Sequence, residues 1–174
     1  MKKTIYLLFL LVSFNGFSQF GLEVGFGSSK AKLAEGNVSI STDAYSGFTA
    51  GLVAEIPVSD SFKLETGLSF SFFKVDGENS NSWGIPLVGK FYTNPDDGFH
   101  IRAGLGYSSS MEDVDTDIVK KGAFGAGFGL GYDISDNFSI VGEYSTQLSN
   151  SAGDALDGVK IKGSGFGVGL QYFF

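Results

Sequence analysis

The chain has 174 residues, with 26 glycines, 18 phenylalanines, no cysteine and a formal net charge of −7 at neutral pH. The length suits a single domain. The acidic net charge argues against nucleic-acid binding, which needs a basic patch, and the absence of cysteine excludes disulfides and thiolate metal sites. We therefore expect one domain that does not bind nucleic acid.

The chain begins like a secretory signal peptide. Lys2 and Lys3 form the charged start, Ile5 to Val12 form a short apolar run, and Gly16-Phe17-Ser18 supplies small residues before Gln19. This apolar run is too short to cross about 30 Å of hydrocarbon as a helix. We predict that residues 1–18 are removed on export and that residues 19–174 form the mature domain.

The mature chain alternates apolar residues with small or polar ones, which is the period of a β-strand. Each alternating segment is close to the ~9–11 residues of a tilted membrane-spanning strand. The predicted strands are eight: 20–27, 45–56, 62–73, 83–92, 99–107, 123–132, 138–147 and 164–174.

The predicted connections are of two alternating kinds. Short ones with turn-forming residues are 57–61, 93–98 and 133–137, and longer polar ones are 28–44, 74–82, 108–122 and 148–163. Outer-membrane barrels alternate short periplasmic turns with longer outer loops in this way, and both of their termini lie in the periplasm.

Glycine and phenylalanine separate onto opposite strand faces, most clearly in "KGAFGAGFGLGYDI" (121–134). With one parity of each strand assigned outward, the exceptions are Phe73 and Phe173, which face inward, and Gly89 and Gly142, which face outward. A soluble lipocalin-type barrel would keep its large apolar residues inside. We therefore predict an all-β fold, an eight-stranded antiparallel up-and-down transmembrane β-barrel in the outer membrane with aromatics toward lipid.

The last ten residues, "GFGVGLQYFF", place alternate apolar side chains on one face and end on an aromatic. This pattern resembles the C-terminal insertion signal of bacterial outer-membrane barrels. The resemblance implies the barrel-assembly machinery as a partner during insertion. The residues of this predicted signal are Phe166, Val168, Leu170, Tyr172 and Phe174.

Three segments carry a resemblance to a known family. "WGIPLVGKFYT" (83–93) is similar to the "IPLLLKY" strand of the porT-type outer-membrane β-barrel domain of Bacteroidetes, and "IRAGLGYS" (101–108) and "FGAGFGLGYDI" (124–134) resemble the strands that follow it. The resemblance implies a small OmpA-like barrel in the outer membrane. Glu143 stands where the family often has arginine, so no role of that arginine is carried over.

Charged side chains at inward positions are the candidate functional residues. They predict either a network of ion pairs that neutralises buried charge, or an ion-selective constriction or proton path. The first interpretation is favoured because side chains usually fill an eight-stranded lumen. The inward set is Glu23, Glu55, Lys63, Glu65, Lys90, His100, Arg102 and Glu143.

No motif predicts an enzyme. The glycine-rich runs lack the G-x-G-x-x-G and P-loop spacings, so no cofactor is expected, and the single histidine has no metal ligands at a fixed spacing. One acidic loop has the D-x-D-x-D spacing of a calcium loop without the glycine and glutamate that an EF-hand needs. A solvated loop is favoured and calcium stays open for Asp113, Asp115 and Asp117.

These features predict a structural or surface-interaction protein that is embedded in outer-membrane lipid, with its loops outside and its lumen filled by side chains. The alternative is a narrow channel for ions or small solutes. A wide porin is excluded because such pores need about 16 strands or more. The sequence does not identify a ligand of the loops.

Overall fold

The structure, a computed structural model, describes residues 19–75, 77–156 and 158–174. The predicted signal peptide, residues 1–18, lies outside the described residues. Most of the described chain forms one antiparallel sheet. Its strands are β1 (Gln19–Glu35), β2 (Val38–Ser41), β3 (Tyr45–Ser59), β4 (Phe62–Val75), β5 (Glu78–Tyr92), β6 (Phe99–Ser110), β7 (Gly122–Ser135), β8 (Phe138–Gln147) and β9 (Val159–Phe173).

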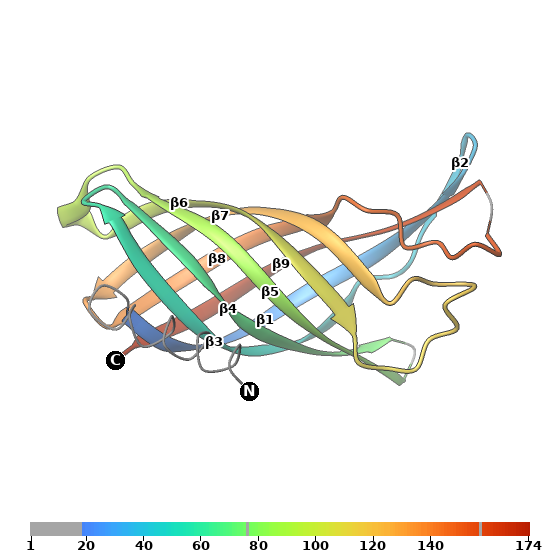
Figure 1. Cartoon of the computed structure of the whole chain (residues 1–174), viewed down its shortest axis with the longest axis horizontal. Coiled ribbons are helices and arrows are strands. Elements are labelled where there is room, and N and C mark those ends of the chain that lie inside the picture. Colours follow the sequence, from blue (N-terminus) through green and yellow to red (C-terminus); the bar gives the residue numbers. More distant parts are fainter. Residues whose placement is uncertain (1–18, 76, 157) are drawn as a thin grey trace, which may run out of the picture.

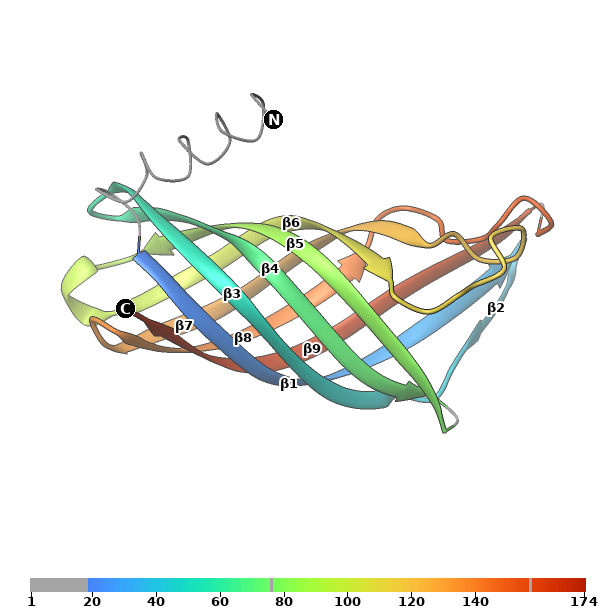
Figure 2. The ribbon, with the colours of Figure 1, turned by 60° about the horizontal axis from the view of Figure 1, so that its bottom comes forward.

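The sheet closes on itself through β1 and β9. Strands β3 to β9 pair in chain order, while β1 pairs with β3 on one side and with β9 on the other. The closing register runs from Gly21 opposite Phe173 to Glu35 opposite Val159. The predicted eight-stranded antiparallel barrel is therefore confirmed. The short strand β2 pairs with the far end of β1 and projects beyond the ring (Figures 1 and 2).

The two ends of the barrel differ (Figure 1). At the short-turn end, β1 begins, β9 ends, and tight connections join β3 to β4, β5 to β6 and β7 to β8. The β5–β6 connection holds the 3₁₀ helix η2 (Pro95–Asp97), capped by the Asn94 side chain and ended by Gly98 with a φ of 70°. At the opposite, long-loop end lie β2 and the longer connections.

The strands are longer than predicted. Strand β1 continues to Glu35, β5 begins at Glu78 and β9 begins at Val159, so most of the predicted loops 28–44 and 74–82 and part of 148–163 are strand. Residues 78–82 of β5 are polar on both faces, so no apolar alternation marks them. The added residues of β1 and β9 do alternate, with Ala31 and Ile161 each between two lysines, but their outward side chains are lysines, unlike those of the predicted spanning segments. At the short-turn end, β3 and β7 likewise run to Ser59 and Ser135 through register shifts, which corrects the predicted turns.

Two long connections are folded against each other. The β6–β7 and β8–β9 connections form a bridge between Val119 and Ala152, and the Lys120 amide donates to the Ser151 carbonyl at 2.8 Å. Ala152 is only 4% exposed. The described parts of these two connections therefore pack against each other.

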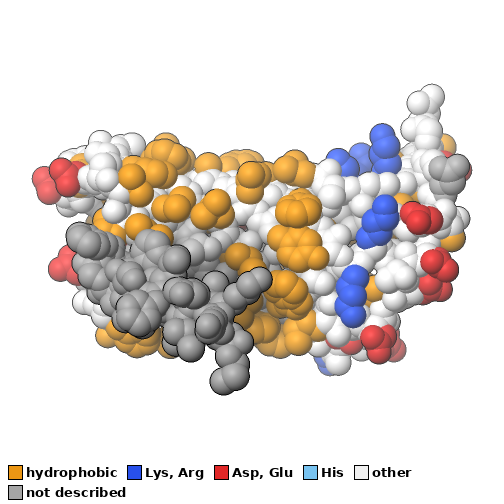
Figure 3. All heavy atoms as spheres, in the orientation of Figure 1, with side chains coloured by type: hydrophobic (Ala, Val, Ile, Leu, Met, Phe, Trp, Pro, Cys, Tyr) orange, Lys and Arg blue, Asp and Glu red, His pale blue; other side chains and the backbone are white. Residues whose placement is uncertain are grey.

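The outward residues form an apolar band around the barrel, part of which is visible in Figure 3. Phe128 and Phe166 are 63% and 58% exposed, and Phe128 contacts Tyr144 at a ring-centroid distance of 5.5 Å. Outward glycine Gly89 is covered by the stacked rings of Phe62 and Phe91, 4.7 Å apart. In the described part of the chain, no helix is both long and apolar enough to cross a bilayer.

Candidate functional site

The lumen near the short-turn end holds a buried cluster built on Glu55 of β3. Its carboxylate accepts hydrogen bonds from Lys63 Nζ of β4 at 2.7 Å and from Lys90 Nζ of β5 at 2.6 Å. Glu55 and Lys90 are 2% and 1% exposed. The Lys90 ammonium also lies 5.4 Å from the Phe173 ring, which faces inward as expected from its parity. The buried charges of this cluster are thus paired.

Asp133 belongs to the same cluster and was not predicted. It accepts hydrogen bonds from Tyr92 Oη at 2.7 Å and Ser139 Oγ at 2.5 Å, and lies 3.9 Å from Lys90 Nζ. The sequence places Asp133 in the predicted turn 133–137, where the apolar alternation fades, whereas the structure has it in β7. Extending the inward parity of Gly131 by one step would have found it.

A second cluster lies beside the first and is centred on Arg102 of β6. Its guanidinium makes a bidentate pair with Glu65 of β4, at 2.8 Å and 3.2 Å, and its Nε lies 3.7 Å from Glu143 of β8. The bidentate geometry is the strong form of this ion pair. Gln171 of β9, also missed from sequence, is fully buried and donates to Glu23 of β1 at 2.6 Å.

These contacts form one layer across the lumen, here called the ion-pair layer and defined by Glu55, Lys63, Lys90, Glu65 and Arg102. The structure thus brings the eight inward residues predicted from sequence into two adjacent groups. Glu23 and Glu143 lie at the margin of the layer, where they also line a cavity of about 120 Å³.

His100 is fully buried in the first cluster. Its Nδ1 lies 3.1 Å from the Gly98 carbonyl and 3.7 Å from the Asp133 carboxylate. Ser139 donates its hydroxyl hydrogen bond to Asp133 and not to His100. A serine nucleophile needs its hydroxyl on the histidine base, so these three residues are not arranged as a catalytic triad.

The acidic loop does not assemble a metal site in the structure. Among the residues that the structure describes, no three histidine, aspartate or glutamate side chains gather around a common point. Asp115 instead accepts a hydrogen bond from the Asp117 amide at 3.1 Å, which is a local turn contact.

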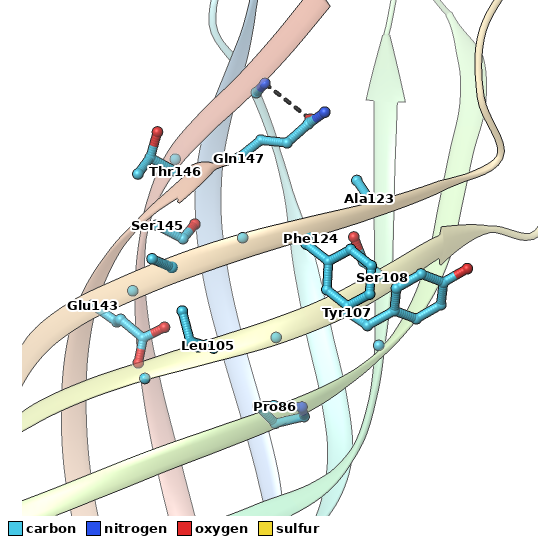
Figure 4. A pocket seen from close by; sticks show the side chains of 18 of the residues that line it. Pro86, Leu105, Tyr107, Ser108, Ala123, Phe124, Glu143, Ser145, Thr146 and Gln147 are labelled. Atoms are coloured by element: carbon cyan, nitrogen blue, oxygen red, sulfur yellow. Dashed lines mark hydrogen bonds between the residues drawn. The ribbon is translucent and has the colours of Figure 1, made fainter. Parts of the chain in front are cut away.

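The lumen near the long-loop end is open. A cavity of about 320 Å³, here called the long-loop cavity, is lined by small inward side chains including Ser69, Ser108 and Ser145, and by Glu143 (Figure 4). At its lining, Gln147 accepts a hydrogen bond from the Gly163 amide at 3.1 Å. The prediction of a lumen filled by side chains is therefore wrong for this half, because glycine and serine leave the space unfilled.

The comparison with protein families decides the class. The model of the family described as outer membrane protein beta-barrel domain matches residues 7–174. The chain belongs to this family of outer-membrane β-barrels. The predicted outer-membrane location agrees with that membership, and in such barrels the short turns face the periplasm. By that rule we expect the ion-pair layer of this chain in the periplasmic half of the barrel and the long-loop cavity in the outer half.

Solved structures with this fold are similar at low sequence identity. The attachment invasion locus protein Ail of Yersinia pestis is 14% identical with a TM-score of 0.50, covering 90% of this chain and 99% of its own. A de novo designed transmembrane β-barrel is 16% identical with a TM-score of 0.50, covering 88% and 95%. The outer membrane enzyme PagL is 14% identical with a TM-score of 0.50, covering 84% and 98%. A search of curated proteins found no match.

Proposed function

We propose that this barrel is a surface-interaction protein of the outer membrane whose lumen does not conduct. Residues 1–18 direct its export and are removed. The long-loop end faces outside, and the C-terminal residues through Phe174 are recognised by the barrel-assembly machinery. Within the family, the three quoted segments favour the porT-type barrels of Bacteroidetes.

The observation that carries the proposal is the burial of the ion-pair layer. The layer is buried on four neighbouring strands, where Lys90, Glu55, Glu65 and Arg102 are all between 1% and 3% exposed. Gln171, which is fully buried, adds a polar side chain from β9. Removing one partner of a buried ion pair costs about 3–5 kcal/mol. A path for ions through this layer would require such pairs to break.

The long-loop end supplies the interaction surface. Strand β2 is an edge strand that projects at the long-loop end (Figure 2), and its residues Val38 and Ile40 are 67% and 68% exposed. An exposed edge strand with apolar side chains in water suits a partner that adds a strand or packs against that face. The adjoining hydrogen-bonded loops give this surface a fixed shape.

The second candidate is a narrow cation channel, and the two cavities favour it. Glu143 lines both the long-loop cavity and the smaller cavity that Glu23 and Arg102 share. The three carboxylates Glu23, Glu65 and Glu143 face the single guanidinium of Arg102 in this region. An excess of negative charge along a lumen would favour cations over anions.

We also propose that the chain is not an enzyme. PagL is an enzyme, but its similarity to this chain is one of fold. The histidine of this chain lies in the periplasmic half, fully buried, without a nucleophile on its ring.

Planar-bilayer recording tests the proposal. The refolded wild-type barrel, verified by heat-modifiable migration on gels, is expected to give no conductance steps. Replacing both Glu55 and Lys90 with alanine removes the centre of the ion-pair layer, and we expect small steps from the folded variant. The control Ser145→Ala, in the long-loop cavity, should stay silent. Reproducible steps from the wild type that Glu65→Ala or Arg102→Ala abolishes would establish the channel instead.

A further inference from the structure

The exposed lysines of the described chain lie at one end of the barrel. Figure 3 shows part of them as a belt between the apolar band and the acidic tips of the long-loop end. The exposed charged residues of the short turns are instead acids, such as Asp96 and Asp136. The exposed lysines are Lys30, Lys32, Lys74, Lys120, Lys121, Lys160 and Lys162.

Four of these lysines form a compact group on the closing strands. Lys32 of β1 lies directly opposite Lys162 of β9, while Lys30 is opposite Ser164 and Lys160 is opposite Ala34. Opposed side chains are about 5 Å apart, and neighbours on one strand face are about 7 Å apart. Lys30, Lys32, Lys160 and Lys162 are here called the lysine patch.

The lysine patch faces away from the lumen. Its members share the strand parity of Phe26 and Phe166, which are 48% and 58% exposed on the lipid-facing surface. Lys30 follows Phe26 by four residues, which is about 13 Å along the strand and about 10 Å along the membrane normal for a tilted strand. Lysine stems can also lie back along the apolar surface. The ammonium groups therefore reach the headgroup layer of the outer leaflet.

The patch carries charge that the described protein does not neutralise. None of its four lysines makes an ion pair with another described residue, whereas Lys120 in a loop lies 3.9 Å from Asp154. Like charges directly opposite each other destabilise a sheet. A clustered, unpaired set of lysines at headgroup height is complementary to an anionic headgroup.

We propose that the lysine patch binds the phosphate groups of a phosphorylated glycolipid in the outer leaflet. Two phosphates on one sugar headgroup would each meet a pair of ammonium groups across the β1–β9 seam. Lysine suits this role because it is a point charge that does not need one fixed geometry. The inference rests on the proposed outer-membrane placement with the long-loop end outside, and not on whether the lumen conducts.

Binding of a defined lipid tests the assignment. The folded barrel in nonionic detergent is titrated with lipid A that carries two phosphates, and with the same lipid A after its phosphates are removed. We expect the wild type to prefer the phosphorylated form, with an affinity that falls as salt rises. Replacing all four patch lysines with serine should weaken that binding on the order of a hundredfold or more.

The matched control replaces Lys120 and Lys121 with serine, which removes two exposed lysines from a loop and should keep the affinity. If the variant with all four patch lysines replaced does not fold, the double variant Lys32→Gln and Lys162→Gln is measured instead. Its affinity for phosphorylated lipid A is expected to fall about tenfold. Equal affinity for both lipid forms, or unchanged affinity in the patch variant, would overturn the proposal. Lysine-dependent binding of soluble heparin as tight as that of lipid A would also overturn it, in favour of a soluble glycan.

Discussion

At the scale of the residue, the alternating glycines of β7 have different surroundings: Gly125 and Gly127 line the long-loop cavity, whereas Gly131 is closely packed. A methyl group at Gly131 would collide with the His100 ring, which is fully buried and has no room to move. A methyl group at Gly106 of β6 would meet its nearest neighbours, the Ile85 carbonyl and the Pro86 Cα, at ordinary distances of 3.5 Å and 3.7 Å. Inward glycines are therefore required at some positions and replaceable at others.

Gly131→Ala is expected to destabilise the folded barrel by about 1–3 kcal/mol, the usual penalty for overpacking a filled interior. Gly106→Ala, at the same parity of the adjacent strand, should change stability little. The measurement is the urea midpoint of unfolding in lipid vesicles, followed by the heat-modifiable band. Equal midpoints for the two variants would mean that the His100 ring does not restrict this position.

The residues of the candidate site were predictable from the sequence in part. Strand parity placed the inward charges on the correct face because it depends only on the strand period. Asp133 and Gln171 were missed, the first because it lies where the apolar alternation of β7 fades and the second because it carries no charge. Which acid pairs with which base depends on the register between strands such as β3 and β5, which a single sequence does not encode locally.

At the scale of the element, β9 closes the barrel against β1 and ends at the short-turn rim. The Phe174 amide donates to the Phe20 carbonyl at 2.8 Å, and its ring, 72% exposed, meets Tyr172 edge-on at 5.6 Å. Phe173 is 2% exposed, and its carbonyl accepts from Asn137 Nδ2 at 2.7 Å. The last two residues thus occupy opposite faces of the wall.

Deletion of Phe174 should reduce the fraction of folded barrel in outer membranes several-fold. The deletion removes the hydrogen bond to Phe20 and the terminal aromatic, and unpaired backbone in lipid costs several kcal/mol per group. Phe174→Tyr is the control and should insert normally, since it keeps both features. The folded fraction is measured at matched expression. An undiminished yield for the deletion would remove the reason to regard this end as an insertion signal.

Elements were predictable where apolar alternation marks them. All eight spanning strands were found, because lipid on one side and a crowded lumen on the other force opposite residue types onto the two faces. The extensions of β1, β5 and β9 into water were missed, since lysines occupy the outward positions of β1 and β9 there and the β5 extension is polar on both faces. The β1–β2 hairpin turn is still marked in the sequence by Gly36, whose φ of 56° is a conformation that favours glycine.

At the scale of the whole molecule, the barrel is asymmetric along its axis. The short-turn half is closed by ion pairs, whereas the long-loop half contains the open cavity and presents the lysine patch outside. Because the chain has no cysteine, single cysteines can be introduced as position markers without a background. Ser145, exposed and facing the long-loop cavity, and Ser61, exposed in the β3–β4 turn, mark the two ends.

The most direct measurement is labelling of Ser145→Cys and Ser61→Cys in intact cells with a small, membrane-impermeant maleimide. An outer-membrane barrel with its open half outside predicts that Ser145→Cys reacts in intact cells, while Ser61→Cys reacts only after the outer membrane is permeabilised. The reverse pattern would contradict the orientation. Failure of Ser145→Cys to react under both conditions, in protein shown to be folded, would contradict the open outer half.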